Sequence, residues 1–194
     1  MNGMFLLFLI FSGFTMNLVL QCALGIKGVA ESKIPVNRLT LIKSGLIFLS
    51  IILLWLFFSR VIFSIFSGII VYVLLFPVSA IVYDSLEYFV FHFLLKKDTQ
   101  DESIINFPGG ITSAAVFISV NIAGSFLEAV VLSFGFTSGI FLVNLIIREI
   151  RKRAALEAVP VFMRGKPLVL TAMGLLSLIF TTASLLIFRM IDAG

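Results

Sequence analysis

Six polar residues lie inside long apolar stretches of the sequence and have side chains that could bind or conduct an ion. They are Asn17, Gln21, Asp84, Glu87, Thr112 and Ser113. The two amides are four residues apart and the two carboxyl groups are three apart, so each pair would share one face of a helix. Ionisable groups at membrane depth mark ion or proton routes. We therefore take these six residues as ion-path candidates.

Each pair also has a structural interpretation, and the sequence leaves both open. Asn17 and Gln21 could instead form polar contacts between neighbouring helices, which are common in membrane bundles. Asp84 and Glu87 fall near one end of an apolar stretch. A carboxylate there could reach water or a nearby lysine at little energetic cost and would then serve as an interfacial anchor.

The remaining reactive residues form no recognisable site. Cys22 is the one cysteine, so a disulfide within the chain is excluded and a cluster would need ligands from a partner. His92 is the one histidine, and the sequence has no Walker loop, dinucleotide fingerprint, nucleophile elbow or paired zinc-ligand motif. We expect no independent active site and no cofactor held by this chain alone.

Membrane-spanning helices must position these residues. The 194 residues are 60% hydrophobic and 12% charged, with a mean hydropathy of +1.18, unlike a soluble domain. Apolar windows predict six spans, at roughly 3–25, 41–58, 66–88, 104–123, 126–147 and 168–188. The sequence therefore predicts an all-α polytopic membrane protein with a single membrane domain. Its cations lie in short loops between apolar runs, so no nucleic-acid partner is expected.

The positive charges predict the orientation of the chain. Six of the fourteen Lys and Arg residues lie in one basic segment, 147–166. With six spans, the loops after spans one, three and five share a side, and they hold all the Lys and Arg residues except Arg60 and Arg189. Basic residues are retained on the cytoplasmic side. We therefore expect both termini to lie on the outer side of the membrane.

The order of the spans suggests two inverted three-helix repeats, about 1–98 and 99–194. Span one contains Asn17, Gln21 and Gly25, and span four opens with Pro108-Gly109-Gly110. Both are expected to be broken helices, because proline and adjacent glycines free backbone groups that lipid cannot satisfy. Paired broken helices point to a central site between the repeats.

The start of span five has local signals of its own. Ser125 and Glu128 fit a capping box, in which the carboxylate bonds a free backbone N–H at the helix start. Gly135 and Gly139 form a small-xxx-small pair, which predicts close packing of another helix against span five.

Several short motifs resemble a known family. In the C-terminal third they are Ile150-Arg151-Lys152-Arg153, Val159-Pro160, Arg164-Gly165 and the segment 172–180, and near the start they are Asn17-Leu18-Val19-Leu20 and Leu24-Gly25-Ile26. Together these resemble the small membrane subunits of the Rnf electron-transport complex and of the sodium-pumping NADH:quinone oxidoreductase, the RnfA and NqrE type. Glu87 falls where these subunits carry a glutamate. The resemblance implies six helices, an inverted repeat, outward termini and a motif loop that includes Arg151, Arg153, Pro160, Arg164 and Gly165.

The chain departs from that family at the cysteines. The subunits it resembles contribute two cysteines to an iron-sulfur cluster, which they share with a sister subunit of opposite orientation. Here the first position is Lys27, and the second falls at Ala114 or Ala115. Cys22 lies five residues before Lys27 and would leave the subunit one ligand short. We expect a diverged member in which the shared cluster is absent or differently supported.

These observations lead to one expected function and two alternatives. The first is a membrane subunit of an Rnf- or Nqr-like ion-translocating electron-transport complex, which supplies scaffold and ion path. Its partners would be a homologous subunit of opposite topology, of the RnfE or NqrD type, and other respiratory-complex subunits. The alternatives are a stand-alone small transporter with the inverted-repeat fold and a structural paralogue without transport.

Overall fold

The computed structural model describes residues 2–21, 38–62, 69–95, 108–156, 160 and 165–192. Within these ranges the ordered elements are helical. They are α1 (Asn2–Ile10), the π-helix η1 (Phe11–Thr15), α3 (Arg38–Phe57), η2 (Phe58–Ile62), α5 (Ile69–Phe89), η3 (Val90–Leu95), α6 (Pro108–Ile122), α7 (Phe126–Leu156) and α8 (Lys166–Asp192).

Four stretches of the described chain are long and apolar enough to cross a membrane. They are Leu41–Ile62, Ile69–Phe93, Phe126–Ala154 and Lys166–Met190. The first and fourth predicted spans correspond to shorter apolar helices, Phe5–Thr15 and Gly110–Ile122. A crossing of a roughly 30 Å hydrocarbon core needs about 20 residues. The all-helical, membrane-embedded character of the chain is thus supported by four helices, and six full spans stay a prediction.

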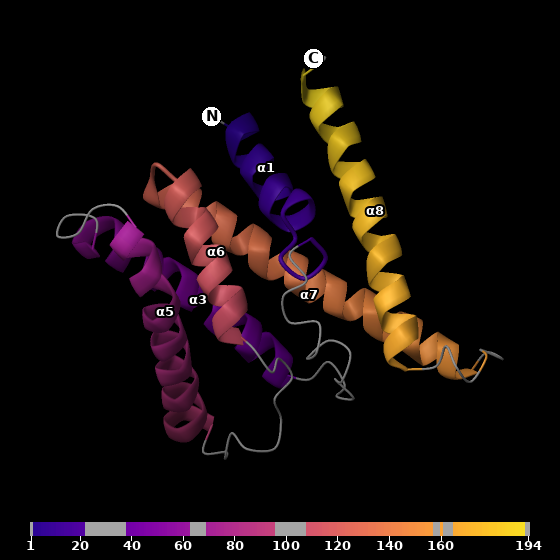
Figure 1. Ribbon diagram of the computed structural model, residues 1–194, viewed down its shortest axis with the longest axis horizontal. Coiled ribbons are helices and arrows are strands. Elements are labelled where there is room, and N and C mark those ends of the chain that lie inside the picture. Colours follow the sequence, from indigo (N-terminus) through magenta and orange to yellow (C-terminus); the bar gives the residue numbers. More distant parts are fainter. Residues whose placement is uncertain are drawn as a thin grey trace.

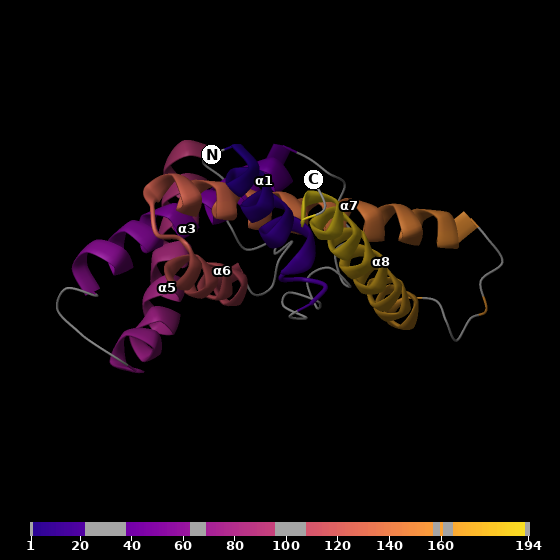
Figure 2. The same cartoon turned by 90° about the horizontal axis from the view of Figure 1, so that it is seen from above.

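Helices α3 and α7 form the centre of the molecule. In each of them 44% of the most apolar window is buried, against 22% in α5 and α8. Figures 1 and 2 show α5 and α6 on one side, α8 on the other and α1 between them. Helix α6 packs on both α5 and α3, while α1 and η1 pack on α7. The start of α1 and the end of α8 lie at the same end of the molecule (Figure 1).

The polar residues between α6 and α7 explain the tight turn there. The Glu128 backbone N–H donates to Ser125 Oγ (3.4 Å), as the capping box predicted. The Glu128 carboxylate bonds one residue earlier than predicted, because Oε2 accepts from the Gly124 N–H at 2.8 Å. Both ends of the cap therefore hold the first turn of α7 against the end of α6.

Three helices differ in length from their predicted spans. Helix α5 contains Pro77 and continues through η3 to Leu95, past the predicted end at 88. Helix α7 continues to Leu156, so the basic segment begins as helix rather than as loop. An ion pair one turn apart, Arg153 Nε to Glu149 Oε1 at 3.2 Å, lies on this extension. Helix α6 starts at Pro108, which suits the first helical position because proline lacks an N–H there.

The predicted motif loop is described only in part. Arg151 and Arg153 belong to α7, and Pro160 is exposed. Gly165 has a positive φ of 87°, a backbone conformation that glycine adopts without steric cost, and α8 begins at the next residue. Arg164 lies outside the described residues, as do Cys22 and Lys27.

Candidate functional site

The first helix breaks at Asn17. Helix α1 widens into η1, and residues 16–21 form turns rather than helix. Asn17 is buried. Its Nδ2 donates to the Gly13 carbonyl at 3.0 Å, and its Oδ1 accepts from the N–H groups of Val19 and Leu20 at 3.2 and 3.3 Å. The side chain therefore satisfies the backbone groups that the break releases.

Glycines bring η1 unusually close to α7. A Cβ added at Gly139 would lie 2.6 Å from the Gly13 carbonyl oxygen and 2.9 Å from Asn17 Nδ2. A Cβ added at Gly135 would overlap Ser12 and lie 3.1 Å from the Leu9 carbonyl oxygen. The predicted packing seam along Gly135 and Gly139 is confirmed, and its partner is the broken part of span one.

Gln21 has a different role from Asn17. It is exposed, and its Nε2 donates to Thr181 Oγ1 at 2.8 Å. The Gln21 N–H donates to the Asn17 carbonyl at 2.8 Å, so the two residues are one turn apart. Gln21 makes an interhelical contact to α8, whereas the Asn17 amide, among the described residues, bonds its own segment.

The second polar region lies among α3, α5 and α6 and contains an ion pair. Lys43 Nζ on α3 lies 3.2 Å from Glu87 Oε1 on α5, and the two side chains are only 9% and 20% exposed. The ammonium also lies 5.3 Å from the centre of the Phe91 ring, a cation–π arrangement. Removing a charge from water costs several kcal/mol of free energy per ion. Placing this pair between apolar helices therefore carries a desolvation cost for both side chains.

Polar side chains continue from the ion pair along the inner face of α5. Ser79, Tyr83 and Glu87 are spaced four residues apart, so they follow one face. Ser79 and Tyr83 are fully buried, and Tyr83 interacts with Glu87. Ser79 Oγ makes a short hydrogen bond with Ser113 Oγ of α6. We call the set Lys43, Ser50, Ser79, Tyr83, Glu87 and Ser113 the polar seam.

Two buried hydroxyls, one in the seam and one on α6, make no hydrogen bond to another described residue. Ser50 lies seven residues after Lys43 on α3 and is fully buried, and Ser119 on α6 is also fully buried. Within the described part of the chain, no group hydrogen-bonds to either Oγ. A buried polar atom without a partner costs free energy, so these two hydroxyls are candidates for contact with water or a passing ion.

The structure brings together only some of the six predicted candidates. Glu87 and Ser113 belong to the polar seam, and Thr112 is buried on the same helix as Ser113. Asp84 is exposed on α5, whereas Glu87 is partly buried and pairs with Lys43. These positions agree with the alternative in which a carboxylate reaches the surface or a nearby lysine, and the ion-path role of Asp84 stays a prediction. Side chains three positions apart on a helix point in directions about 60° apart. The edge of the buried face of α5 falls between Asp84 and Glu87.

Sequence reasoning missed the residues that complete the seam. The charge pattern of the sequence gives Lys43 a topological role only, and no sequence pattern points to Ser79. The available signal was Lys43 itself, which lies inside the apolar run 41–58, where an unpaired cation is costly. No group of three or more His, Cys, Asp or Glu side chains that could hold a metal occurs in the described ranges. His92 stacks on Tyr88, with ring centres 5.2 Å apart.

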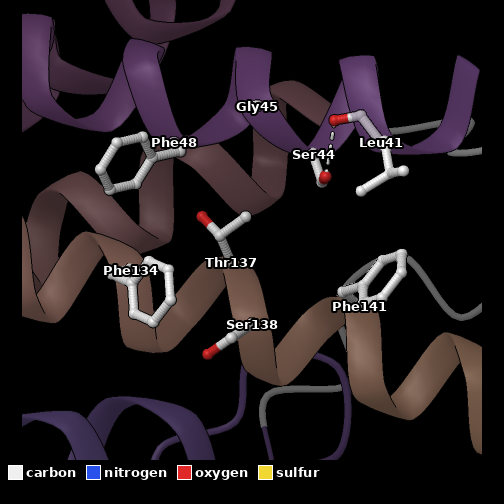
Figure 3. A pocket seen from close by; sticks show the side chains of 8 residues that line it. All are labelled: Leu41, Ser44, Gly45, Phe48, Phe134, Thr137, Ser138 and Phe141. Carbon is white, nitrogen blue, oxygen red and sulfur yellow. Dashed lines mark hydrogen bonds between the residues drawn. The ribbon is translucent and has the colours of Figure 1, made fainter. Parts of the chain in front are cut away.

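A pocket of about 390 Å³ opens between α3 and α7. Phe48 faces Phe134 at one end and Leu41 faces Phe141 at the other (Figure 3). Gly45 lies between Leu41 and Phe48 on the α3 side, and a Cβ added there would meet nothing within 4 Å. The other lining residues are Ser44, Thr137 and Ser138.

Comparison with known proteins adds no relative. No protein-family model matches the sequence, and no curated protein matches it either.

Proposed function

We propose that the chain is an ion-path subunit of a membrane-embedded, ion-translocating complex of the Rnf or Nqr kind. The polar seam is the part of the chain that would contact the ion. Glu87 is the binding carboxylate, Lys43 is its counter-charge in the ion-free state, and the Ser79, Ser113 and Ser50 hydroxyls extend the polar route along the helices. In this proposal the redox chemistry belongs to other subunits.

The observation that carries the proposal is the ion pair between two apolar helices. Lys43 and Glu87 are 44 positions apart in sequence, and both lie in segments long and apolar enough to span a membrane. Each residue lies near one end of its segment, yet both side chains are largely buried. Buried ionisable residues in membrane-spanning segments are candidates for ion pathways. A cation that reaches Glu87 competes with the Lys43 ammonium for the same carboxylate, which makes the pair a reversible gate. The assignment to a respiratory complex rests on the sequence resemblance.

The test exchanges each of two carboxylates for its amide. Asp84→Asn is a matched control for Glu87→Gln, because both residues lie on α5 but Asp84 is exposed. Each variant replaces the native chain in its own membrane, and ion uptake by inverted vesicles is followed with sodium and with proton indicators. We expect Glu87→Gln to reduce uptake at least ~10-fold. A ten-fold reduction corresponds to a loss of about 1.4 kcal/mol of ion-binding free energy. Asp84→Asn should leave uptake within ~2-fold of wild type, in keeping with the small effect of exposed charges.

Equal uptake by Glu87→Gln and wild type, with equal amounts of folded protein, would overturn the ion-path role. The complex is tested separately, by mild-detergent purification of the tagged chain from its native membrane. Recovery with flavin-bearing and cluster-bearing subunits supports the respiratory assignment. Recovery of the chain by itself contradicts that assignment and leaves the ion path to be judged on the uptake result.

A second candidate is a transporter that works without partners. The break after η1 and the short helix α6 favour it, because interrupted helices frame substrate sites in small transporters. Solute uptake by the purified chain in liposomes would support this candidate. Uptake that appears only in the intact complex would exclude it.

The proposed location is the bacterial cytoplasmic membrane, with both termini on the outer side. The charge distribution of the sequence supports this orientation. The nearness of the α1 start and the α8 end is consistent with an even number of crossings (Figure 1).

A further inference from the structure

The pocket between α3 and α7 is separate from the polar seam. It is lined by the segment Leu41 to Phe48 of α3 and the segment Phe134 to Phe141 of α7. Both segments belong to helices that can span a membrane. Leu41 and Phe134 are more than half exposed, so the pocket opens sideways, toward the lipid.

The polar groups of the lining need no hydrogen bond from an occupant. The three hydroxyls of the pocket already donate to their own helices. Ser44 donates to the Leu41 carbonyl at 2.8 Å, Thr137 to Ser133 at 2.9 Å, and Ser138 to Gly135 at 3.0 Å. The other surfaces are aromatic, aliphatic or glycine (Figure 3). An apolar occupant therefore leaves no polar group of the pocket unsatisfied.

The dimensions of the pocket suit an alkyl chain. The seven-residue rise from Leu41 to Phe48 is about 10 Å, and the pocket has a volume of about 390 Å³. An extended hydrocarbon chain fits a space of that length. A helix from a second copy is the competing occupant, which the cross-linking test below distinguishes.

Two basic side chains continue the same face of α7. Arg148 and Lys152 are seven and eleven residues beyond Phe141, so they stay on the side of α7 that faces the pocket, about 10 and 16 Å along its axis. Both are exposed. The neighbouring carboxylate, Glu149, pairs with Arg153 and does not occupy this face. A phosphate at this position would meet positive charge where the apolar part of α7 ends.

We infer that this pocket binds one acyl chain of an anionic phospholipid whose phosphate lies against Arg148 and Lys152. The glycine at position 45 provides the room for the chain. Phe48 and Phe134, whose rings meet edge to face at 6.4 Å, close the end of the pocket farther from these basic residues. The site is distinct from the proposed ion path, because Lys43 of α3 pairs with Glu87 of α5 and neither residue lines the pocket.

The first test uses the wild-type protein. Phosphatidylglycerol with a photoreactive group in one acyl chain is added to liposomes that contain the full chain, and adducts are mapped by mass spectrometry. We expect adducts to concentrate on 41–48 and 134–141. Adducts spread equally over the exposed apolar face of α8, which includes Leu175, Leu178 and Leu185, would overturn the proposal. Cross-linked dimers joined through these two segments would also overturn it.

The second test fills the pocket. Gly45→Leu is compared with Gly174→Leu, because an added Cβ at either glycine meets nothing within 4 Å, but only Gly45 lines the pocket. We expect Gly45→Leu to abolish most of the mapped adducts and Gly174→Leu to retain them. Equal labelling of 41–48 and 134–141 in both variants would contradict the site.

The third test concerns the head group. We expect Arg148→Gln and Lys152→Gln each to lower the preference for phosphatidylglycerol over phosphatidylcholine about five-fold, the effect of one basic residue at an anionic surface. The positions of the adducts should not change. An unaltered preference in the double variant would overturn the head-group assignment.

Discussion

The two polar regions of the molecule use their hydrogen-bonding groups in opposite ways. At the break after η1, the amide of Asn17 bonds the backbone of its own segment and leaves none of its polar atoms unused. In the polar seam, Lys43 and Glu87 bond across two helices, and the hydroxyl of Ser50 has no hydrogen-bond partner among the described residues. The break also holds a buried hydroxyl without a partner among the described residues, on Thr15. What separates the two regions is therefore the ion pair, because the amide at the break holds its own segment, whereas the seam joins two helices through opposite charges.

The largest loss of stability is expected from removing one charge of the polar seam. Lys43→Met leaves Glu87 without its counter-charge, and breaking a buried pair costs about 3–5 kcal/mol. The double variant Lys43→Met with Glu87→Leu should recover most of that stability, because no charge is then left unpaired. Thermal unfolding in detergent measures both. If the double variant also recovered ion uptake, the seam would be structural like the break, and the contrast between the two regions would disappear.

A smaller loss of stability is expected from adding a methyl group where η1 crosses α7. Gly139→Ala places a methyl group 2.6 Å from the Gly13 carbonyl oxygen, and the backbone must shift, at a cost of about 1–3 kcal/mol. Gly174→Ala is the control, since its Cβ would meet nothing within 4 Å. Unfolding temperatures of the two variants in the same detergent are compared. If both variants unfolded at the same temperature, the backbones of η1 and α7 would lie farther apart than these contacts indicate.

The smallest loss of stability is expected at the break itself, from replacing Asn17. Asn17→Ala removes an amide that bonds two backbone N–H groups, and the loss of such a cap costs about 0.5–2 kcal/mol. Gln21→Ala, which removes an exposed contact to Thr181, should cost less. Neither change should alter ion uptake per folded molecule, measured in the same vesicles as Glu87→Gln. A selective loss of uptake in Asn17→Ala would place the break on the ion path after all.

What the sequence predicted well was local. The cap at Ser125 and Glu128 depends on residues at most four apart, and the Gly135 and Gly139 pair depends on one turn of one helix. The apolar runs predicted the long helices because length and hydropathy decide a span. The ends of these helices were less predictable, since α7 continues through its basic residues to Leu156.

The sequence could not predict the contacts that make the candidate site. The partner of Glu87 lies 44 positions away on α3, and no local pattern specifies which helices pack together. The choice between Asp84 and Glu87 depended on where the packing boundary of α5 falls. The sequence predicted a broken helix in span one, but it did not predict that the Asn17 side chain itself bonds the backbone groups at the break.

The length of α6 has a consequence for the membrane around the protein. Its 15 residues extend about 22 Å, roughly 8 Å less than a typical hydrocarbon core. A helix that short produces hydrophobic mismatch, which is relieved by local thinning of the bilayer or by burying the helix ends against neighbours such as α3 and α5. Helix α5 beside it has a 25-residue apolar segment, Ile69–Phe93, which extends about 37 Å. The two neighbouring helices therefore cannot both match one bilayer thickness, and the thickness of the host membrane acts on the packing between them.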